Sequence, residues 1–201
     1  TKMFRLLQGD VGSGKTIVSL LSAYNTINSG FQVAMMAPTE ILAKQHYNLA
    51  KKIFPKNLHI EFISGKTDYK TKKKIIEDLS IQKIDIIFGT HAIFQKKINF
   101  KNLGLIIIDE QHKFGVNQRK RLSDKGGNNC DVLLMTATPI PRTLTMTIYG
   151  DMDLSIIREK PKVRKPIKTY SKLENKINDI IGFIKKEINL DNQIFWVCPL
   201  I

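Results

Sequence analysis

The sequence predicts an α/β fold in which helices cover both faces of a mostly parallel sheet. Short apolar segments typical of buried strands alternate with longer segments whose apolar residues recur at helical spacing. A glycine-rich stretch joins the first such strand, residues 4–8, to the first helix, and later strands end in polar residues. The 201 residues, 42% of them hydrophobic, suffice for one full domain and part of another.

The same patterns set the expected order of helices and strands. Residues 15–30 end at Gly30, a residue type that commonly follows a helix, and Thr39 can cap the helix after a strand at 31–37. Further strands are expected at 58–64, 84–90, 103–110 and 131–138, with a lysine-rich helix at 67–80. The residues that share a face on the first two helices are Ile17, Leu20, Leu21, Tyr24 and Ile27, and Leu42, His46, Leu49 and Ile53.

The composition changes at residues 158–168, which hold two prolines and six cationic side chains. This segment is predicted to be a linker. After it, the sequence predicts an amphipathic helix at 174–189 and an apolar strand at 193–201. One helix and one strand cannot bury enough apolar surface to form a core. The sequence therefore predicts a domain at 1–157, a linker at 158–168 and the truncated start of a second α/β domain at 169–201.

Positive charge exceeds negative charge along the chain. Lys and Arg number 32 and Asp and Glu 18, which gives a net charge of +14. Residues 51–100 contribute the largest excess, with 11 lysines against five acidic residues. One interpretation is a basic surface that attracts nucleic acid, and the other is a lysine face that is only solvated.

Hydropathy and cysteine usage argue against a membrane-spanning, secreted or cysteine-ligated metal protein. No apolar run approaches the roughly 20 residues that a membrane-spanning helix needs, and the start of the chain lacks the apolar region of a signal peptide. Cys130 and Cys198 lie far apart without the spacing of metal ligands. This usage favours a reduced, cytoplasmic protein.

Residues 8–16, QGDVGSGKT, contain a phosphate-binding pattern. From residue 9 they match G-x-x-x-x-G-K-[ST], in which glycines let backbone N–H groups face an anion and the following helix adds its positive end. Lys15 is expected to reach the β- and γ-phosphates of a nucleoside triphosphate, and the Thr16 hydroxyl to bind Mg²⁺. The alternative, a glycine-rich turn with a fortuitous lysine, is disfavoured by the strand before the pattern and the helix after it. The expected phosphate-binding residues are Gly9, Asp10, Val11, Gly12, Ser13, Gly14, Lys15 and Thr16.

A pair of acidic residues follows the apolar run at 105–108. Asp109, at the end of the expected strand, is predicted to hold Mg²⁺ directly or through water. Glu110 is predicted to orient and deprotonate an attacking water. The alternative is a helix N-cap, but the phosphate loop upstream in the same sheet favours catalysis. Lys15, Asp109 and Glu110 are therefore the candidate catalytic residues.

These motifs resemble those of a known group of motors. Residues 109–112, DEQH, are similar to the DExH box of superfamily 2 helicases, residues 136–138 to their third motif, and residues 37–45 to motif Ia. More narrowly, six segments resemble the RecG family of bacterial branched-DNA helicases. They are LLQGDVGSGKT, MAPTEILAKQHY, GTHAIFQ, LGLIIIDEQHKFGVNQR, MTATPIPRTLTMTIYGD and WVCPLI.

The resemblance implies a RecA-like P-loop NTPase that uses ATP and Mg²⁺ to move on double-stranded DNA at forks and junctions, in recombination and repair. It also implies a monomeric bacterial protein, cytoplasmic and nucleoid-associated. Thr39, Thr90 and His91 are expected to contact the DNA backbone, since hydroxyls and amides bind phosphate oxygens without selecting a sequence. Two alternatives stay open: Thr39 as a helix cap alone, and His91 as a packed loop histidine.

The resemblance assigns further roles near the third motif. His112 is expected to link the nucleotide site to Thr136 or Thr138, with a buried core histidine as the alternative. Residues 139–143, PIPRT, are interpreted as a structural turn from a strand into a helix. Arg142 is an additional candidate for the cleft between the two motor domains.

The chain also departs from the family. Lys113 stands where the family has arginine, which keeps the charge and loses the bidentate fork. The family's adenine motif and arginine finger lie outside this sequence, so residues 1–201 alone are expected to bind ATP·Mg²⁺ weakly and hydrolyse it negligibly. Two other functions are open. A transcription-repair coupling translocase has DEEQ and GFGKT where this chain has DEQH and GSGKT, and Lys15 and Glu110 disfavour a non-catalytic nucleotide-binding scaffold.

Overall fold

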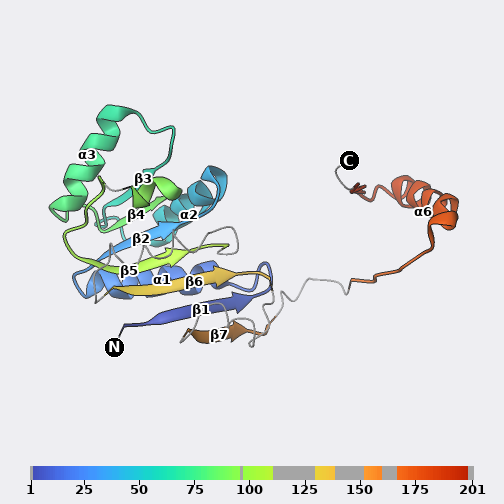
Figure 1. Cartoon of the computed structure of the whole chain (residues 1–201), viewed down its shortest axis with the longest axis horizontal. Helices are drawn as coiled ribbons and strands as arrows, with labels where there is room; N and C mark the ends of the chain where they lie inside the picture. Colours follow the sequence, from blue (N-terminus) through green and yellow to red (C-terminus); the bar gives the residue numbers. More distant parts are fainter. Residues whose placement is uncertain (1, 96, 111–129, 139–151, 160–166, 199–201) are drawn as a thin grey trace. The chain divides into compact units, whose positions relative to one another are not determined.

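The computed structural model describes residues 2–95, 97–110, 130–138, 152–159 and 167–198. The chain divides into two compact units, residues 1–162 and 163–201. In the first unit, the described strands form a seven-stranded sheet in the order β3-β4-β2-β5-β6-β1-β7, and every pairing is parallel (Figure 1). The predicted parallel α/β fold is confirmed. The strands are β1 (Phe4–Gly9), β2 (Gln32–Met36), β3 (Ile60–Ile63), β4 (Ile86–Gly89), β5 (Leu103–Ile108), β6 (Asp131–Thr136) and β7 (Asp153–Ile157).

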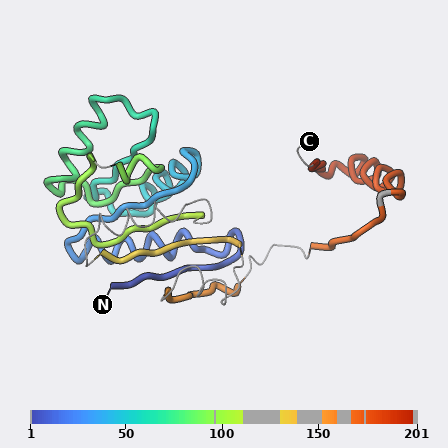
Figure 2. The backbone as a smooth tube through the Cα atoms, in the orientation of Figure 1, coloured from blue at the N-terminus to red at the C-terminus, as the bar shows by residue number. Residues whose placement is uncertain are grey.

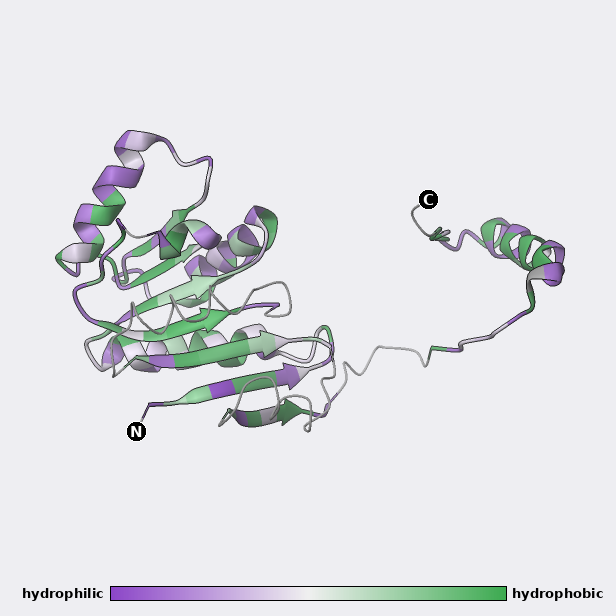
Figure 3. Cartoon of the chain, viewed as in Figure 1, coloured by the Kyte–Doolittle hydropathy of each residue, from purple (hydrophilic) through white to green (hydrophobic). Residues whose placement is uncertain are grey.

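Helices pack on both faces of this sheet. Successive side chains of a strand point to opposite faces, so each strand contributes to two cores. Val33 and Met35 of β2 pack with α1 and the end of α2, whereas Ala34 between them packs with α3 and η1. The central strands are hydrophobic along most of their length, as a doubly covered parallel sheet requires (Figure 3). The helices are α1 (Lys15–Asn28), α2 (Glu40–Ile53), α3 (Tyr69–Ser80) and the short 3-10 helix η1 (His91–Phe94).

The connection from β1 to β2 determines which strands have neighbouring carboxyl ends. The chain leaves β1 through α1 and passes β6 and β5 before it returns as β2 (Figure 2). Because all the strands are parallel, the segments that follow β1, β6, β5 and β2 lie along one edge. Polar residues that are up to about 130 positions apart in the sequence are thereby brought to the same side of the molecule.

The helix faces that pack on the sheet match those predicted only in part. Leu20, Ile27 and His46 are buried as predicted. Leu21 of α1 and Ile53 of α2, also predicted to share these faces, are 59% and 47% exposed. Small side chains occupy several of the buried positions, because they let a helix backbone lie close to the sheet and fill the interface without voids. The buried residues are Ser19, Leu20, Ala23 and Ile27 in α1, and Ala43, His46 and Ala50 in α2.

Strand β7 was not expected from the sequence. It pairs with β1 in parallel, with Leu6 beside Leu154. The guanidinium group of Arg5 in β1 donates hydrogen bonds to the Ser155 hydroxyl at 2.8 Å and to the Asp153 carboxylate at 3.1 Å. The exposed and half-buried residues of β7 give it a weak hydropathy pattern, which explains why the sequence did not reveal it.

The second unit contains helix α6 (Ile177–Asn189), which confirms the predicted amphipathic helix. The strand predicted at 193–201 is wrong for residues 193–198, which are described and form no strand. A strand is stable only when a neighbour pairs with it, and the side chains of Phe195 and Val197 are 86% and 89% exposed. The predicted linker at 158–168 lies largely outside the described residues, and the predicted domain bounds stay a prediction. Among the described residues, no helix combines the length and apolar character that crossing a membrane demands.

Candidate active site

The glycine-rich loop between β1 and α1 has the backbone conformation that the phosphate-binding pattern predicts. Gly12 and Gly14 have φ angles of 80° and 95°, in the left-handed region that favours glycine. Gly14 is the N-cap of α1, and no side chain caps this helix and no acidic residue lies in its first turn. The backbone N–H groups and the positive end of the helix dipole can therefore serve an anion.

Three hydrogen bonds inside the loop hold its shape. The Lys15 Nζ donates hydrogen bonds to the carbonyl oxygens of Gly9 at 2.7 Å and Asp10 at 2.9 Å. The Ser13 N–H donates to the same Asp10 carbonyl at 3.1 Å. Gly9 has no room for a side chain, because an added Cβ would lie 2.5 Å from the Ser13 Oγ and 3.1 Å from the Ile157 Cβ. Close packing against Ser13 of the loop and against β7 thus favours glycine at the end of β1.

Asp109 directly follows β5 and is 7% exposed. Its N–H donates to the Met36 carbonyl of β2 at 2.9 Å. Its Oδ1 accepts a hydrogen bond from the Glu110 N–H at 3.0 Å, and its Oδ2 lies 2.7 Å from the Nε2 of His46. Glu110 has a φ of 50°, an uncommon conformation for a residue with a side chain.

Thr136 and Thr138 lie at the end of β6, between the phosphate loop and Asp109 in the sheet order. Their hydroxyl oxygens are 2.8 Å apart, and the Thr138 N–H donates to the Thr136 Oγ1 at 3.2 Å. Thr136 pairs with Gln8 of β1, so the threonine pair adjoins the loop. The ends of β1 and β5 are two strand spacings apart, about 10 Å. His112, the proposed partner of this pair, lies outside the described residues, as do Lys113, Arg142 and the turn at 139–143.

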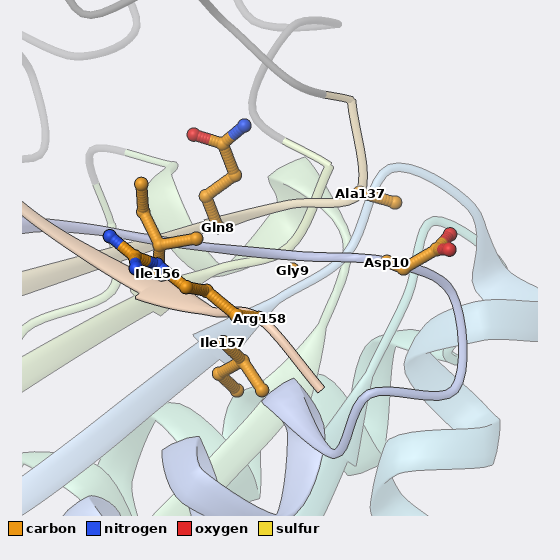
Figure 4. Close-up of a pocket in the computed structure, with 7 residues that line it drawn as sticks. All are labelled: Gln8, Gly9, Asp10, Ala137, Ile156, Ile157 and Arg158. Carbon is orange, nitrogen blue, oxygen red and sulfur yellow. The ribbon is translucent and has the colours of Figure 1, made fainter. Parts of the chain in front are cut away.

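A pocket of about 350 Å³ opens beside the loop, at the ends of β1 and β7 (Figure 4). Its position next to the phosphate loop makes it part of the candidate nucleotide site. Within the described part of the chain, the buried Ser13 Oγ has no hydrogen-bond partner. A hydroxyl is a donor that a phosphate oxygen can satisfy, so this orphaned group fits the predicted ligand. The pocket is lined by Gln8, Gly9, Asp10, Ala137, Ile156, Ile157 and Arg158.

The residues present also fit Mg²⁺. No group of three or more His, Cys, Asp or Glu side chains in the described ranges forms a metal cage made by protein alone. Mg²⁺ bound with a nucleotide does not need one, because it takes one or two protein ligands together with phosphate oxygens and water. The Thr16 hydroxyl and the Asp109 carboxylate are oxygen donors of the required kind.

The residues expected to contact DNA lie along the same edge of the sheet. Thr39 follows β2 and is exposed, and its Oγ1 accepts a hydrogen bond from the Leu42 N–H at 3.3 Å as the N-cap of α2. The predicted cap is confirmed. Thr90, half-buried, and His91, exposed, follow β4, which is the neighbour of β2. Contact of these three residues with DNA stays a prediction.

His46 is the residue of this site that the sequence analysis placed only on a helix face. In the structure its Nε2 contacts Asp109, a candidate metal ligand. The available signal was a histidine among apolar residues on one face of α2, because a buried polar group needs a hydrogen-bond partner. The sequence alone gave no means of identifying that partner.

The parallel sheet, with a glycine-rich phosphate loop after β1 and an acidic pair after β5, defines a RecA-like helicase domain. The sequence model of DEAD/DEAH box helicases matches residues 3–147, and the chain belongs to this family. Within it, the chain is similar to the ATP-dependent DNA helicase RecG. It is 48% identical to RecG of Bacillus subtilis over 201 residues, covering 100% of this chain and 29% of that protein. With RecG of Thermotoga maritima it shares 46% identity over 200 residues, covering 99% of this chain and 26% of that protein.

Solved structures give the same result. The structure of RecG bound to a three-way DNA junction matches with a TM-score of 0.81 and 42% identity, over 100% of this chain and 27% of that one. The helicase domain of Pyrococcus furiosus Hef matches with a TM-score of 0.60 at 21% identity, over 76% of this chain and 35% of that one, and supports the fold alone. The resemblance to RecG that the motifs indicate is confirmed. The chain spans less than a third of the length of these RecG relatives.

Proposed function

We propose that this chain is the ATP-binding motor domain, with the start of a second motor domain, of an ATP-dependent helicase that acts on branched double-stranded DNA. The observation that carries the proposal is the placement of the phosphate loop and of Asp109–Glu110 along one edge of the sheet. The similarity to RecG, one structure of which is bound to a three-way DNA junction, supports branched DNA as the substrate class.

Each candidate residue has a chemical role in this proposal. The backbone of residues 9–16 and Lys15 bind the phosphates, and Thr16 and Asp109 would hold Mg²⁺, which neutralises charge on the phosphate oxygens when it is bound. Glu110 accepts a proton from the attacking water. Thr136 and Thr138 connect this site to the rest of the motor, and Thr39, Thr90 and His91 bind DNA phosphates.

The test is ATP hydrolysis by the full-length protein with a three-way junction and with linear duplex. We expect the junction to stimulate hydrolysis more than the duplex does. Glu110→Gln should retain ATP and lower the hydrolysis rate at least about 100-fold, because it removes the general base. Glu77→Gln on the exposed surface of α3 is the matched control and should keep the wild-type rate. Equal hydrolysis by both variants would contradict the assignment of Glu110, and absence of any DNA-stimulated hydrolysis by the wild type would contradict the function.

A further inference from the structure

We propose that His46 is a positioning residue that orients the Asp109 carboxylate for a divalent cation and connects it to the start of α2, where DNA is expected to bind. The inference rests on the proposed function and adds a means by which the two ligands of the site affect each other. It is carried by the 2.7 Å contact between the His46 Nε2 and the Asp109 Oδ2, in which both residues are buried.

The contact fixes the carboxylate from one side. An ionised carboxylate accepts hydrogen bonds only, so the His46 Nε2 carries the hydrogen when Asp109 is ionised. The other oxygen, Oδ1, accepts the Glu110 N–H, and the two bonds together hold the plane of the carboxylate. Each carboxylate oxygen has a second lone pair, so a cation can bind an oxygen whose direction is already set.

His46 belongs to a helix that packs on β3 and β4, but its side chain contacts a residue at the end of β5. The ring of Tyr47, the next residue of α2, lies 5.8 Å from the ring of Phe62 in β3 and 6.1 Å from that of Phe88 in β4. Asp109 follows β5, which is separated from β4 by β2. Apolar packing therefore fixes α2 to one side of the sheet, and the His46–Asp109 hydrogen bond ties it to the strand end that carries the acidic pair.

The same helix begins at the expected DNA contact. Thr39 caps α2, and His46 lies seven residues further along, about 10 Å at 1.5 Å per residue. Lys66, with its Nζ 3.9 Å from the Glu40 carboxylate, pairs with the acidic residue in the first turn of this helix. A phosphate bound at Thr39 and a cation bound at Asp109 would thus act on two ends of one rigid segment. Coupling of this kind is reciprocal: a cation–nucleotide complex must change the affinity for DNA by the same factor as DNA changes the affinity for that complex.

The experiment compares three variants of the full-length protein. His46→Phe keeps a ring and removes the donor, and His46→Gln keeps a donor at a similar length. His59→Ala is the matched control, because His59 also faces an aspartate, with its Nδ1 3.7 Å from Asp85, but it is exposed and directly precedes β3. Thermal unfolding shows which variants are folded, and binding of ADP is measured with Mg²⁺ and with EDTA. Binding of a forked duplex is then measured with and without MgADP.

In EDTA, we expect His46→Phe to bind ADP within about twofold of the wild type. The gain in ADP affinity on adding Mg²⁺ should be about 10-fold smaller than in the wild type, which is the usual effect of removing a residue that supports a metal ligand. The effect of MgADP on duplex affinity should shrink in parallel, His46→Gln should retain most of both effects, and His59→Ala should match the wild type. If His46→Phe does not fold, the same comparison of His46→Gln with His46→Asn, which is too short to reach Asp109, decides. If the folded His46 variants gain as much ADP affinity from Mg²⁺ as the wild type does, the role of His46 is overturned and the proposed function is not affected. A wild type that binds no MgADP would overturn this inference and the proposed function together.

Discussion

The Nζ of Lys15 lies 2.7 Å from the carbonyl oxygen of Gly9, to which it donates a hydrogen bond. It donates a second bond to the Asp10 carbonyl at 2.9 Å, so the first residue of α1 is tied to the end of β1. One side chain thereby shapes the phosphate loop and places a positive charge within it.

Lys15→Ala should therefore weaken MgATP binding strongly and lower the free energy of unfolding by only about 1 kcal/mol, since Lys15 is half-buried and its partners can be hydrated. Calorimetric titration with MgATP and urea unfolding measure the two effects. Lys44→Ala, on the exposed face of α2, is the control and should change neither. Equal MgATP affinity of the wild type and Lys15→Ala would show that the loop is not the phosphate site.

The lysines of α3 test the origin of the basic excess. The Lys72 Nζ donates to the Gln95 side chain at 2.7 Å, and the Lys73 Nζ lies 3.9 Å from the Glu77 carboxylate. If these residues and Lys74 contact DNA phosphates, replacing all three by Ala should reduce the slope of log K against log salt by up to about 0.9 per lost phosphate contact. Fluorescence anisotropy with a labelled duplex at several salt concentrations measures the slope. An unchanged slope would mean that these lysines do not contact DNA phosphates.

The N-cap of α3 should give stability a dependence on acid pH. The Thr71 N–H donates to the Asp68 Oδ1 at 2.9 Å, and this bond, followed by one with the Thr71 side chain, holds the pKa of Asp68 below its ordinary value of 3.8. The ionised form is favoured in the folded state, so its contribution is complete above about pH 4. It is lost as the pH falls through the lowered folded-state pKa.

The stability difference between the wild type and Asp68→Ala should consequently shrink as the pH is lowered below 4. Urea unfolding between pH 3 and pH 7 measures it. Asp68→Asn keeps an oxygen that can accept the Thr71 N–H and carries no charge, so the stability difference between it and Asp68→Ala should stay nearly constant over this range. A difference between the wild type and Asp68→Ala that does not change with pH would contradict the cap.

The two cysteines should react very differently with iodoacetamide. Burial raises the pKa of Cys130 to about 11, whereas Cys198 is exposed. At pH 8 the native protein should be alkylated at Cys198, with Cys130 modified only after denaturation, because the thiolate is the reactive form. Mass spectrometry of the wild type and Cys198→Ser distinguishes the sites. The raised pKa also affects stability. Between pH 9 and pH 11 the unfolded chain loses the Cys130 proton while the folded protein keeps it, so the free energy of unfolding should fall over this range. Rapid native alkylation of Cys198→Ser at pH 8 would contradict the burial.

The sequence by itself determined the order of the main elements and the local site motifs. Buried parallel strands need continuous apolar runs, and a loop such as residues 9–16 needs glycine where φ is positive, as at Gly12 and Gly14. The N-cap at Thr39 is equally local. These features depend on neighbours a few residues apart, and they can be recognised in the chain without knowledge of its fold.

Only the tertiary structure decided which residues meet across the sheet. His46 and Asp109 are 63 positions apart, and Arg5 lies 148 positions from Asp153, the partner that ties β7 to β1. These contacts follow from the strand order β3-β4-β2-β5-β6-β1-β7, which is not the order along the chain. Hydropathy spacing identifies a strand or a helix face, but the neighbours of that face are set by how all the elements bury their apolar surface together.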